Sequence, residues 1–197
     1  ALDALTSGDN NVAVGKSAGS SITTGSYNVL LGRSAGISLS TGGENIAIGF
    51  AALSLEDGNG KNIAIGTNAL EDLNAGADAY NIAIGHDTGR NITTGTQNTI
   101  IGALAGDALT TGGNNIAIGY KALSTEDTGY GSVAIGPFAL EDQDAGNAYN
   151  VAVGFSAGAE VTSGTYNTLI GGNTGEALTT GSRHVAEGFN AFTTENH

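Results

Sequence analysis

The sequence has no cysteine, methionine or tryptophan, and only one proline among its 197 residues. Without cysteine there are neither disulfides nor thiolate metal sites, and the redox compartment stays open. Lysine and arginine number six against nineteen Asp and Glu, which leaves a formal net charge of −13. Such a chain lacks the positive charge that binding to nucleic acid requires. No apolar run is long enough to span a membrane and no signal peptide is visible, so we expect no membrane insertion.

Glycine, in contrast, is abundant. There are 33 glycines, but they follow no Gly-X-Y period, which excludes collagen. Hydrophobic residues make up 40% of the chain and recur periodically, so we do not expect disorder. Because the chain starts at Ala1 and has no methionine, we expect it to be a segment of a longer repeat protein.

The motif Asn-x-Ala-Ile/Val-Gly recurs from one end of the chain to the other. Counting each repeat from its first residue as position 0, the ladder stands at Asn11, Asn28, Asn45, Asn62, Asn81, Asn98, Asn115, Ser132, Asn150, Asn167 and His184. Subtraction of these numbers gives the steps 17, 17, 17, 19, 17, 17, 17, 18, 17 and 17. A fixed short period indicates a repeat architecture in which each unit packs on its neighbours.

Two glycine positions divide each repeat. Position +4 is always Gly, and +14 is Gly in nine of the ten complete repeats, with Asn59 as the exception. We interpret both as corners, and because Asn tolerates the left-handed conformation best after Gly, we expect +14 to be left-handed. Apolar residues at +1 and +3, such as Ile46 and Ile48, are typical of a short strand whose face points into the coil. Position +11 is a second apolar site in most repeats.

These features predict an all-β protein, a repetitive β-solenoid or parallel β-roll of about eleven 17-residue coils. Strands of successive coils would stack ~4.8 Å apart, which gives a rod roughly 50 Å long. The Asn side chains at position 0 are expected to form an amide ladder, although a simple turn preference would also explain them. The whole chain, residues 1–197, is then one repeat domain.

A longer period is superimposed on the coils. Position +8 is Gly in two consecutive repeats and Leu in the next two, as in Gly19, Gly36, Leu53 and Leu70. The same order starts again at Gly89, and the longer steps close the first and second sets. We therefore divide the chain into super-repeats of about 11–80, 81–149 and 150–197.

Position +2 is Ala in most repeats and Leu or Ile in the second repeat of each set. Because neighbouring strand residues point to opposite faces, we expect +2 to lie outside the coil. A continuous exposed apolar stripe marks an interface, so we predict contacts between the chains of a parallel homotrimer, with a monomeric solenoid as the alternative. The predicted interface residues are Ala13, Leu30, Ala47, Ala64, Ala83, Ile100, Ala117, Ala134, Ala152 and Leu169.

Pairs of acidic residues also recur in register and fall on adjacent coils, where two pairs could stack. Stacked carboxylates repel one another unless a cation or a proton intervenes, and carboxylate oxygens are ligands that Ca²⁺ takes. Nearby residues that could add oxygens are Asn74, Asp78, Asp144 and Asn147. A solvated acidic face is the alternative reading. The candidate Ca²⁺ ligands are Glu56, Asp57, Glu71, Asp72, Glu126, Asp127, Glu141 and Asp142.

The sequence offers no catalytic or cofactor-binding residues. His86, His184 and His197 are scattered, without a Ser/His/Asp grouping or zinc-type spacing. The glycine motifs lack the strand–helix context and the lysine of a phosphate-binding loop. We therefore expect that the protein is not an enzyme and that it takes no cofactor apart from the candidate Ca²⁺.

Two segments, Thr41–Leu53 and Thr111–Leu123, share the pattern Thr-Gly-Gly-x-Asn-Ile-Ala-Ile-Gly-Phe/Tyr-x-Ala-Leu. They resemble the TGxNNxAIGYxAL repeats of phage tail-fibre shafts, which often precede an endosialidase-type chaperone domain. The shorter Val-Ala-Ile-Gly core is similar to the head repeats of trimeric autotransporter adhesins, although those repeats are shorter than the ones in this chain.

The resemblance implies a trimeric fibre of a virion tail, outside the cell, which serves as a stiff shaft or attaches to a glycan or protein on a host surface. A trimeric adhesin on a bacterial surface and a Ca²⁺-stabilised or glycan-binding solenoid are the alternatives.

Overall fold

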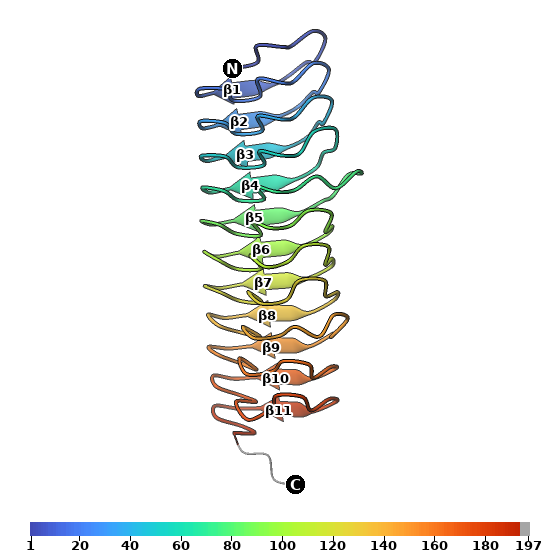
Figure 1. Cartoon of the computed structure of the whole chain (residues 1–197). Helices are drawn as coiled ribbons and strands as arrows, with labels where there is room; N and C mark the ends of the chain where they lie inside the picture. The colour runs from blue at the N-terminus through green and yellow to red at the C-terminus, as the bar shows by residue number, and fades with distance from the viewer. Residues whose placement is uncertain (194–197) are drawn as a thin grey trace.

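The computed structural model describes residues 1–193, which form a rod of stacked coils with the N-terminus at one end (Figure 1). Each coil contributes one short strand, and eleven strands form a single parallel sheet in chain order. The strands are β1 (Val12–Val14), β2 (Val29–Leu31), β3 (Ile46–Ile48), β4 (Ile63–Ile65), β5 (Ile82–Ile84), β6 (Thr99–Ile101), β7 (Ile116–Ile118), β8 (Val133–Ile135), β9 (Val151–Val153), β10 (Thr168–Ile170) and β11 (Val185–Glu187). The described part contains no helix. The predicted all-β solenoid is confirmed.

Strand register follows the repeat through the whole sheet. Val12 lies opposite Val29, and Ile46 opposite Ile63. The longer steps keep this register too, because Ile63 pairs with Ile82. The additional residues bulge outward instead, most visibly in the loop between β4 and β5 (Figure 1). The last predicted super-repeat, 150–197, and His197 extend into residues 194–197, which lie outside the described part.

Four backbone positions in each coil have positive φ, namely −1, +4, +6 and +8. In the third coil these are Glu44, Gly49, Ala51 and Leu53, and only Gly49, at 138°, lies in the region reserved for glycine. The Ala51 N–H donates to Arg33 in the preceding coil, whereas the Leu53 N–H donates to Ala69 in the following one. Hydrogen bonds to both neighbours therefore hold a conformation that non-glycine residues otherwise disfavour.

The prediction that the residue at +14 has a left-handed conformation is wrong for most coils. Only Gly76 and Gly146, in the two longer coils, have positive φ at this position. In the other coils, apart from the one with Asn59, glycine avoids a clash because the corners of adjacent coils nearly touch. A Cβ on Gly25, for example, would lie 2.3 Å from the carbonyl oxygen of Gly42.

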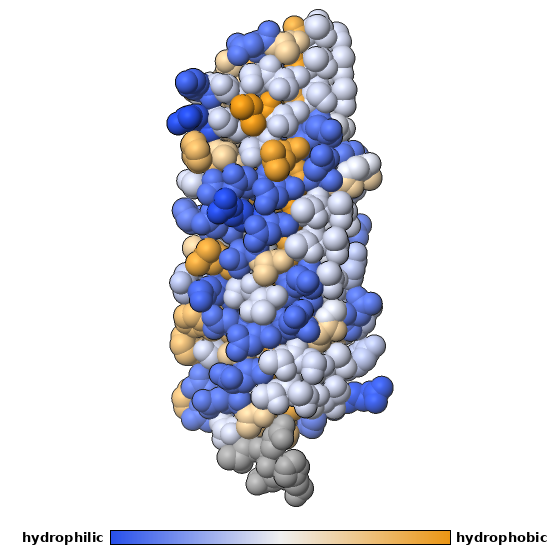
Figure 2. Space-filling view, viewed as in Figure 1, coloured by the Kyte–Doolittle hydropathy of each residue, from blue (hydrophilic) through white to orange (hydrophobic). Residues whose placement is uncertain are grey.

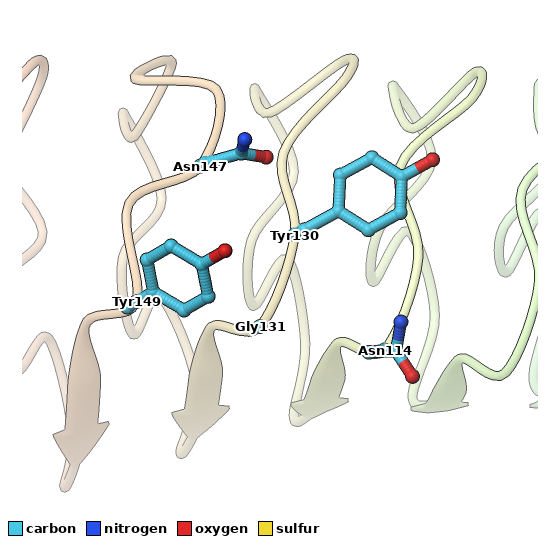
Figure 3. Close-up of a pocket in the computed structure, with 5 residues that line it drawn as sticks. All are labelled: Asn114, Tyr130, Gly131, Asn147 and Tyr149. Carbon is cyan, nitrogen blue, oxygen red and sulfur yellow. The ribbon is translucent and has the colours of Figure 1, made fainter.

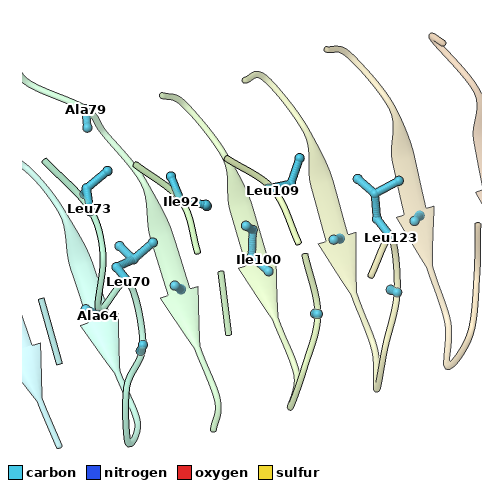
Figure 4. Close-up of a cluster of buried hydrophobic side chains, with 14 of the residues drawn as sticks. Ala64, Leu70, Leu73, Ala79, Ile92, Ile100, Leu109 and Leu123 are labelled. Atoms are coloured by element: carbon cyan, nitrogen blue, oxygen red, sulfur yellow. The ribbon is translucent and has the colours of Figure 1, made fainter. Parts of the chain in front are cut away.

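The faces of the strands are also opposite to our expectation. Residues at +2, the middle of each strand, are buried, whereas those at +1 and +3 are partly or largely exposed. The interior is narrow, and the small residues at +2 and +7 allow opposite walls to approach. Ala47 and Ala52 of the third coil are both fully buried. The core is therefore built from +2, +7, +8 and +11, as the row of side chains from Leu70 to Leu123 shows (Figure 4).

Packing inside the rod explains the longer period. A large residue at +2 occurs only where +8 is glycine, and it fills the space that the glycines leave. Leu30 approaches two such positions, because a Cβ on Gly19 would lie 2.6 Å from its Cδ1 and a Cβ on Gly36 2.9 Å from its Cδ2. In the next two coils the sizes are exchanged, with Ala at +2 and a buried Leu at +8. Exchanging the sizes in this way lets large and small side chains interdigitate in the interior.

The predicted asparagine ladder is confirmed. The Oδ1 of one Asn accepts the backbone N–H of position 0 in the next coil, at 3.0 Å from Asn28 to Asn45 and from Asn45 to Asn62. In most coils its Nδ2 donates to the +14 carbonyl of its own coil, as Asn98 does to Gly112 at 2.9 Å, whereas Asn62 donates to the Gly60 carbonyl at 3.1 Å. The side chain thus joins two corners of a coil and links that coil to its neighbour.

Candidate assembly interface and acidic corners

The residues predicted to form the trimer contact lie inside the rod. Ala13 is partly buried in the first coil, and the other nine, from Leu30 to Leu169, are fully buried. They pack against the +7 and +8 residues of their own and neighbouring coils, so they cannot meet another chain while the coil is folded. The prediction that +2 faces outward is wrong, since Ala is required there by the narrow interior.

The exposed face of the sheet carries two parallel columns of side chains, at +1 and +3, which we call the outer columns. Nearly all of their members are Val, Ile or Leu, and the exceptions are Thr99, Thr168 and Glu187. In the interior of the stack, neighbours above and below cover part of each side chain. At the first strand, where one neighbour is missing, Val12 is 50% and Val14 is 62% exposed.

Exposed aromatic residues lie close to the outer-column positions in the sequence. They stand at −1, just before the strand, and at +5, just after the +4 corner, and include Tyr27, Tyr80, Phe50 and Tyr120. Apolar character is not spread around the whole rod, because the face seen in Figure 2 is mainly hydrophilic with scattered hydrophobic residues. A long apolar strip of this kind on a chain of net charge −13 is typical of an interaction surface.

The eight candidate calcium ligands occupy three kinds of place. Glu56 and Glu126 point into the core at +11, where most coils have Ile, Leu or Val, and both are fully buried. Glu71 and Glu141, at +9, make ion pairs instead, with Arg90 at 2.7 Å and Lys121 at 3.1 Å. Asp57, Asp127 and Asp142 are exposed, and Asp72 is half-buried.

The expected stacking of one acidic pair on the next does not occur. Coils stack position on position, and the pairs occupy different positions, +11 and +12 in one coil and +9 and +10 in the next. Instead, Asp127 shares the +12 position with Asp144 of the following coil. Among the described residues, one group of three carboxylates could hold a metal ion, formed by Glu126, Asp127 and Asp144, whose oxygens lie within 4.8 Å of one another.

Burial raises the pKa of both inward glutamates, and their hydrogen bonds act in the opposite direction. Glu56 accepts two bonds on Oε1 from Asn59, through the backbone N and Nδ2, each at 3.1 Å. Glu126 has Gly129 at the equivalent place. Its Oε2 accepts from Gln143 Nε2 at 3.0 Å and from the Ala145 N–H at 3.3 Å. The Oε1 of Glu126 makes no hydrogen bond of good geometry within the described chain, although the Gly129 N–H lies near enough to favour the charged carboxylate slightly.

Gln143 was not recognised from the sequence as a site residue. It is fully buried at +11, and its amide connects three groups. Nε2 donates to Ser132 Oγ at 3.0 Å as well as to Glu126, and Oε1 accepts from Asn150 Nδ2 at 2.7 Å. Ser132 is the residue that interrupts the asparagine ladder. A polar residue at +11 in the same coil was the available sign that a second side chain bridges the gap.

One hollow on the surface has aromatic walls (Figure 3). It has a volume of about 460 Å³ and is lined by Asn114, Tyr130, Gly131, Asn147 and Tyr149. Gly131 occupies position −1, where the other coils have a side chain. The row of side chains at −1 is therefore interrupted at this coil, which leaves space for the hollow. The Tyr149 ring stacks on Tyr166 at 5.5 Å, and the Tyr130 hydroxyl donates to the Thr111 carbonyl at 2.9 Å. Both rings are thereby held beside the hollow.

Comparison of the chain with protein families, curated proteins and solved structures finds no match. Among the described residues, no helix is long and apolar enough to cross a membrane. Functional proposals therefore rest on the geometry of the rod.

Proposed function

We propose that the chain is a stiff segment of a parallel homotrimeric fibre, of the kind that forms the shaft of a phage tail fibre or tail spike. The observation that carries this proposal is the pair of outer columns, which keep an apolar strip along the sheet from β1 to β10. A single rod in water would expose this strip, and removing it from water is favourable by about 25 cal/mol per Å² of apolar surface.

A second copy of this chain is the partner that the strip fits best. Side chains in the outer columns repeat at the spacing of a parallel sheet, ~4.8 Å. A partner with the same repeat can place one residue against every coil over the full length, whereas a globular partner would match only a few. Closed rings of identical chains are the common form of such assemblies, and the tail-fibre resemblance favours three chains.

Charge supports the same arrangement. The outer columns contain one charged residue, Glu187 in the last strand, although the chain has nineteen acidic residues. Most of the acidic side chains would remain in water on the outside of the assembly. Their repulsion keeps one fibre apart from the next without opposing contact through the apolar strip.

Light scattering coupled to size-exclusion chromatography tests the proposal. We expect a mass three times that of the 19.4 kDa chain. Substituting the outer column in two super-repeats, Ile48→Asp with Ile118→Asp, should yield a folded monomer. The control Thr94→Asp adds a charge to an exposed position outside the strands and should leave the mass unchanged. A wild-type monomer would overturn the proposal, and a dimer would replace the trimer by a two-chain sandwich.

A second candidate function, carbohydrate binding by the shaft, is favoured by the hollow between Tyr130 and Tyr149. Aromatic faces with a few polar groups at the rim are typical of small-ligand sites, and the amides of Asn114 and Asn147 can donate to and accept from hydroxyls. Saturation-transfer NMR with glucose, galactose and N-acetylglucosamine tests it. Transfer should be lost in Tyr149→Ala and kept in Tyr27→Ala, which removes an exposed tyrosine elsewhere. Absence of transfer in the wild type would remove this candidate.

A further inference from the structure

We propose that Glu126, Asp127 and Asp144 form a calcium site at the corner between the seventh and eighth coils. This site is independent of the assembly of the rods, since all three residues belong to one chain. The eight acidic candidates of the sequence are thereby reduced to two, Glu126 and Asp127, and Asp144 becomes a principal ligand.

The first support is the proximity of three negative groups. Their oxygens approach one another within 4.8 Å, and Asp127 and Asp144 occupy the same position in consecutive coils. Like charges at such a distance repel one another unless a cation lies between them. Among the described residues, no Lys or Arg makes an ion pair with any of the three carboxylates, because Lys61, Arg90 and Lys121 pair with Asp78, Glu71 and Glu141. The corner therefore keeps an excess of negative charge.

The second support is the unpartnered oxygen of Glu126. The side chain is fully buried, yet Oε1 makes no hydrogen bond of good geometry within the described chain. Its nearest donor is the Gly129 N–H, which is the weakest of the groups that lower the pKa of Glu126. A buried carboxylate oxygen without a partner is costly, and a bound cation would satisfy it. Gly129 leaves the space that the carboxylate occupies, since a Cβ there would lie 2.3 Å from Glu126 Cδ.

The ligand type and the access both suit Ca²⁺. Calcium takes six to eight oxygen ligands in flexible geometry, from carboxylates and water. Asp127 and Asp144 are exposed, so water can complete the shell and the ion can enter from solvent. Mg²⁺ requires near-ideal octahedral geometry at shorter distances. We therefore expect Mg²⁺ to bind more weakly than Ca²⁺ to a site assembled from two stacked coils.

The first super-repeat contains the matched negative control. At the equivalent places it has Glu56, Asp57 and Asn74, so one carboxylate is replaced by an amide. Glu56 Oε1 is satisfied by Asn59. Neither the third carboxylate nor the unpartnered oxygen is present there, and no calcium site is expected.

Calorimetric titration of the chelator-stripped, full-length chain with CaCl₂ at neutral pH and physiological salt tests the proposal. We expect one saturable site per chain, a rise in Tm with excess Ca²⁺, and a smaller response to Mg²⁺. Asp144→Asn should abolish both effects. Asp57→Asn, which removes the same amount of charge at the first corner, should leave them intact. Because Asn already occupies the equivalent position at residue 74, Asp144→Asn preserves the fold, and circular dichroism checks this.

Three results would overturn the site. One is the absence of saturable calcium binding to the wild type. Another is equal loss of binding in Asp144→Asn and Asp57→Asn, which would indicate general attraction to an acidic rod. The third is binding that survives Asp144→Asn. Conversely, a second site gained by Asn74→Asp with Asn59→Gly would show that these residues are sufficient to create it.

Discussion

The segments 56–74 and 126–144 form equivalent corners, each between the third and fourth coils of its super-repeat. The two corners stabilise a buried glutamate in different ways. In the first corner, Asn59 donates twice to Glu56, the ladder residue is Asn62, and position +11 of the next coil is the apolar Leu73. In the second corner, Gly129 removes the side-chain donor, serine interrupts the ladder, and Gln143 occupies +11.

This difference shows that position 0 and position +11 of a coil act together. The fourth coil has Asn at position 0 and Leu at +11, whereas the eighth has Ser at position 0 and Gln at +11. Each coil therefore has one amide side chain at these two positions. Gln143 reaches Ser132, Asn150 and Glu126 from the opposite wall of the coil. The strands of both coils nevertheless keep the same register. Buried polar groups therefore change as a set, which is expected where each must remain paired.

Among the substitutions that test this difference, Gln143→Leu should change the free energy of unfolding most. It places the leucine of the first corner in the second corner, while Ser132 remains at position 0. Ser132 Oγ loses a donor, and Asn150 and Glu126 each lose one of their bonds. Since an unpaired buried polar group costs about 1–3 kcal/mol, we expect the free energy of unfolding to fall by about 2–3 kcal/mol. Urea denaturation measures it, and Leu73→Met, a volume-conserving change at the equivalent position, is the control. A change equal to that of the control would contradict the bridging role.

A smaller effect should follow when the ladder residue is exchanged at the same time. Asn at position 132 restores the side chain that the fourth coil has, so Ser132→Asn with Gln143→Leu should recover more than half of the lost stability. The double-mutant cycle should give a coupling of about 1–2 kcal/mol, within the range found for residues in one network. Additive single effects would show that the two positions are independent.

The pH dependence of stability should be reduced by Glu126→Gln. Burial raises the pKa of Glu126 in the folded chain above its ordinary value of 4.5, so the folded state binds more protons than the unfolded one. The contribution of Glu126 is then fully present below pH 4.5 and is lost as the pH rises through the folded pKa.

In the presence of a chelator, Glu126→Gln should therefore raise the free energy of unfolding at neutral pH and leave it nearly unchanged below pH 4.5, where the carboxyl is protonated in both states. Urea titrations across the acidic range measure this, with Glu56→Gln for comparison. We expect less gain from Glu56→Gln, because both donors of Asn59 favour the charged form of Glu56. Equal gains would mean that the two corners do not differ electrostatically.

The smallest effect is expected from Asn59→Gly, which gives the first corner the residue of the second. Glu56 Oε1 keeps the backbone N–H and loses the side-chain donor, so a loss of about 0.5–1.5 kcal/mol, the usual worth of one hydrogen bond, is expected. Thermal unfolding at neutral pH checks it. Ser163→Gly, at an exposed residue outside the corner whose side chain makes no hydrogen bond within the described chain, controls for the added flexibility of glycine, and an equal loss there would refute the role of the amide.

Much of the fold was accessible from the sequence because every coil repeats the same chemistry. The +4 glycines, the strands at +1 to +3 and the asparagines at position 0 follow from a period that imposes the same environment on each coil. The wrong assignment was the orientation of the strand. Three residues of alternating direction, such as Ile46, Ala47 and Ile48, fit either face, and hydrophobicity alone favoured the larger residues for the interior.

A sign of the correct orientation was nevertheless present. Leu30, Ile100 and Leu169 at +2 occur only in coils where +8 is glycine, as expected if these positions share the interior. The candidate metal ligands were limited in a similar way. Sequence spacing identified the acidic pairs as candidates. It could not show that Glu126 points into the core or that Asp127 lies next to Asp144 in the following coil. Nor could it show that Glu71 forms an ion pair with Arg90.

The sequence by itself determined the rod, because a short fixed period with glycine corners leaves stacked coils as the way to pair every strand. Only the tertiary structure decided which side of each strand is inside, since the width of the coil sets that choice and leaves room for alanine but not for isoleucine at most +2 positions. The same holds for the acidic corner between the seventh and eighth coils. Its three carboxylates converge because coils stack position on position, a relation that exists only once the chain is wound.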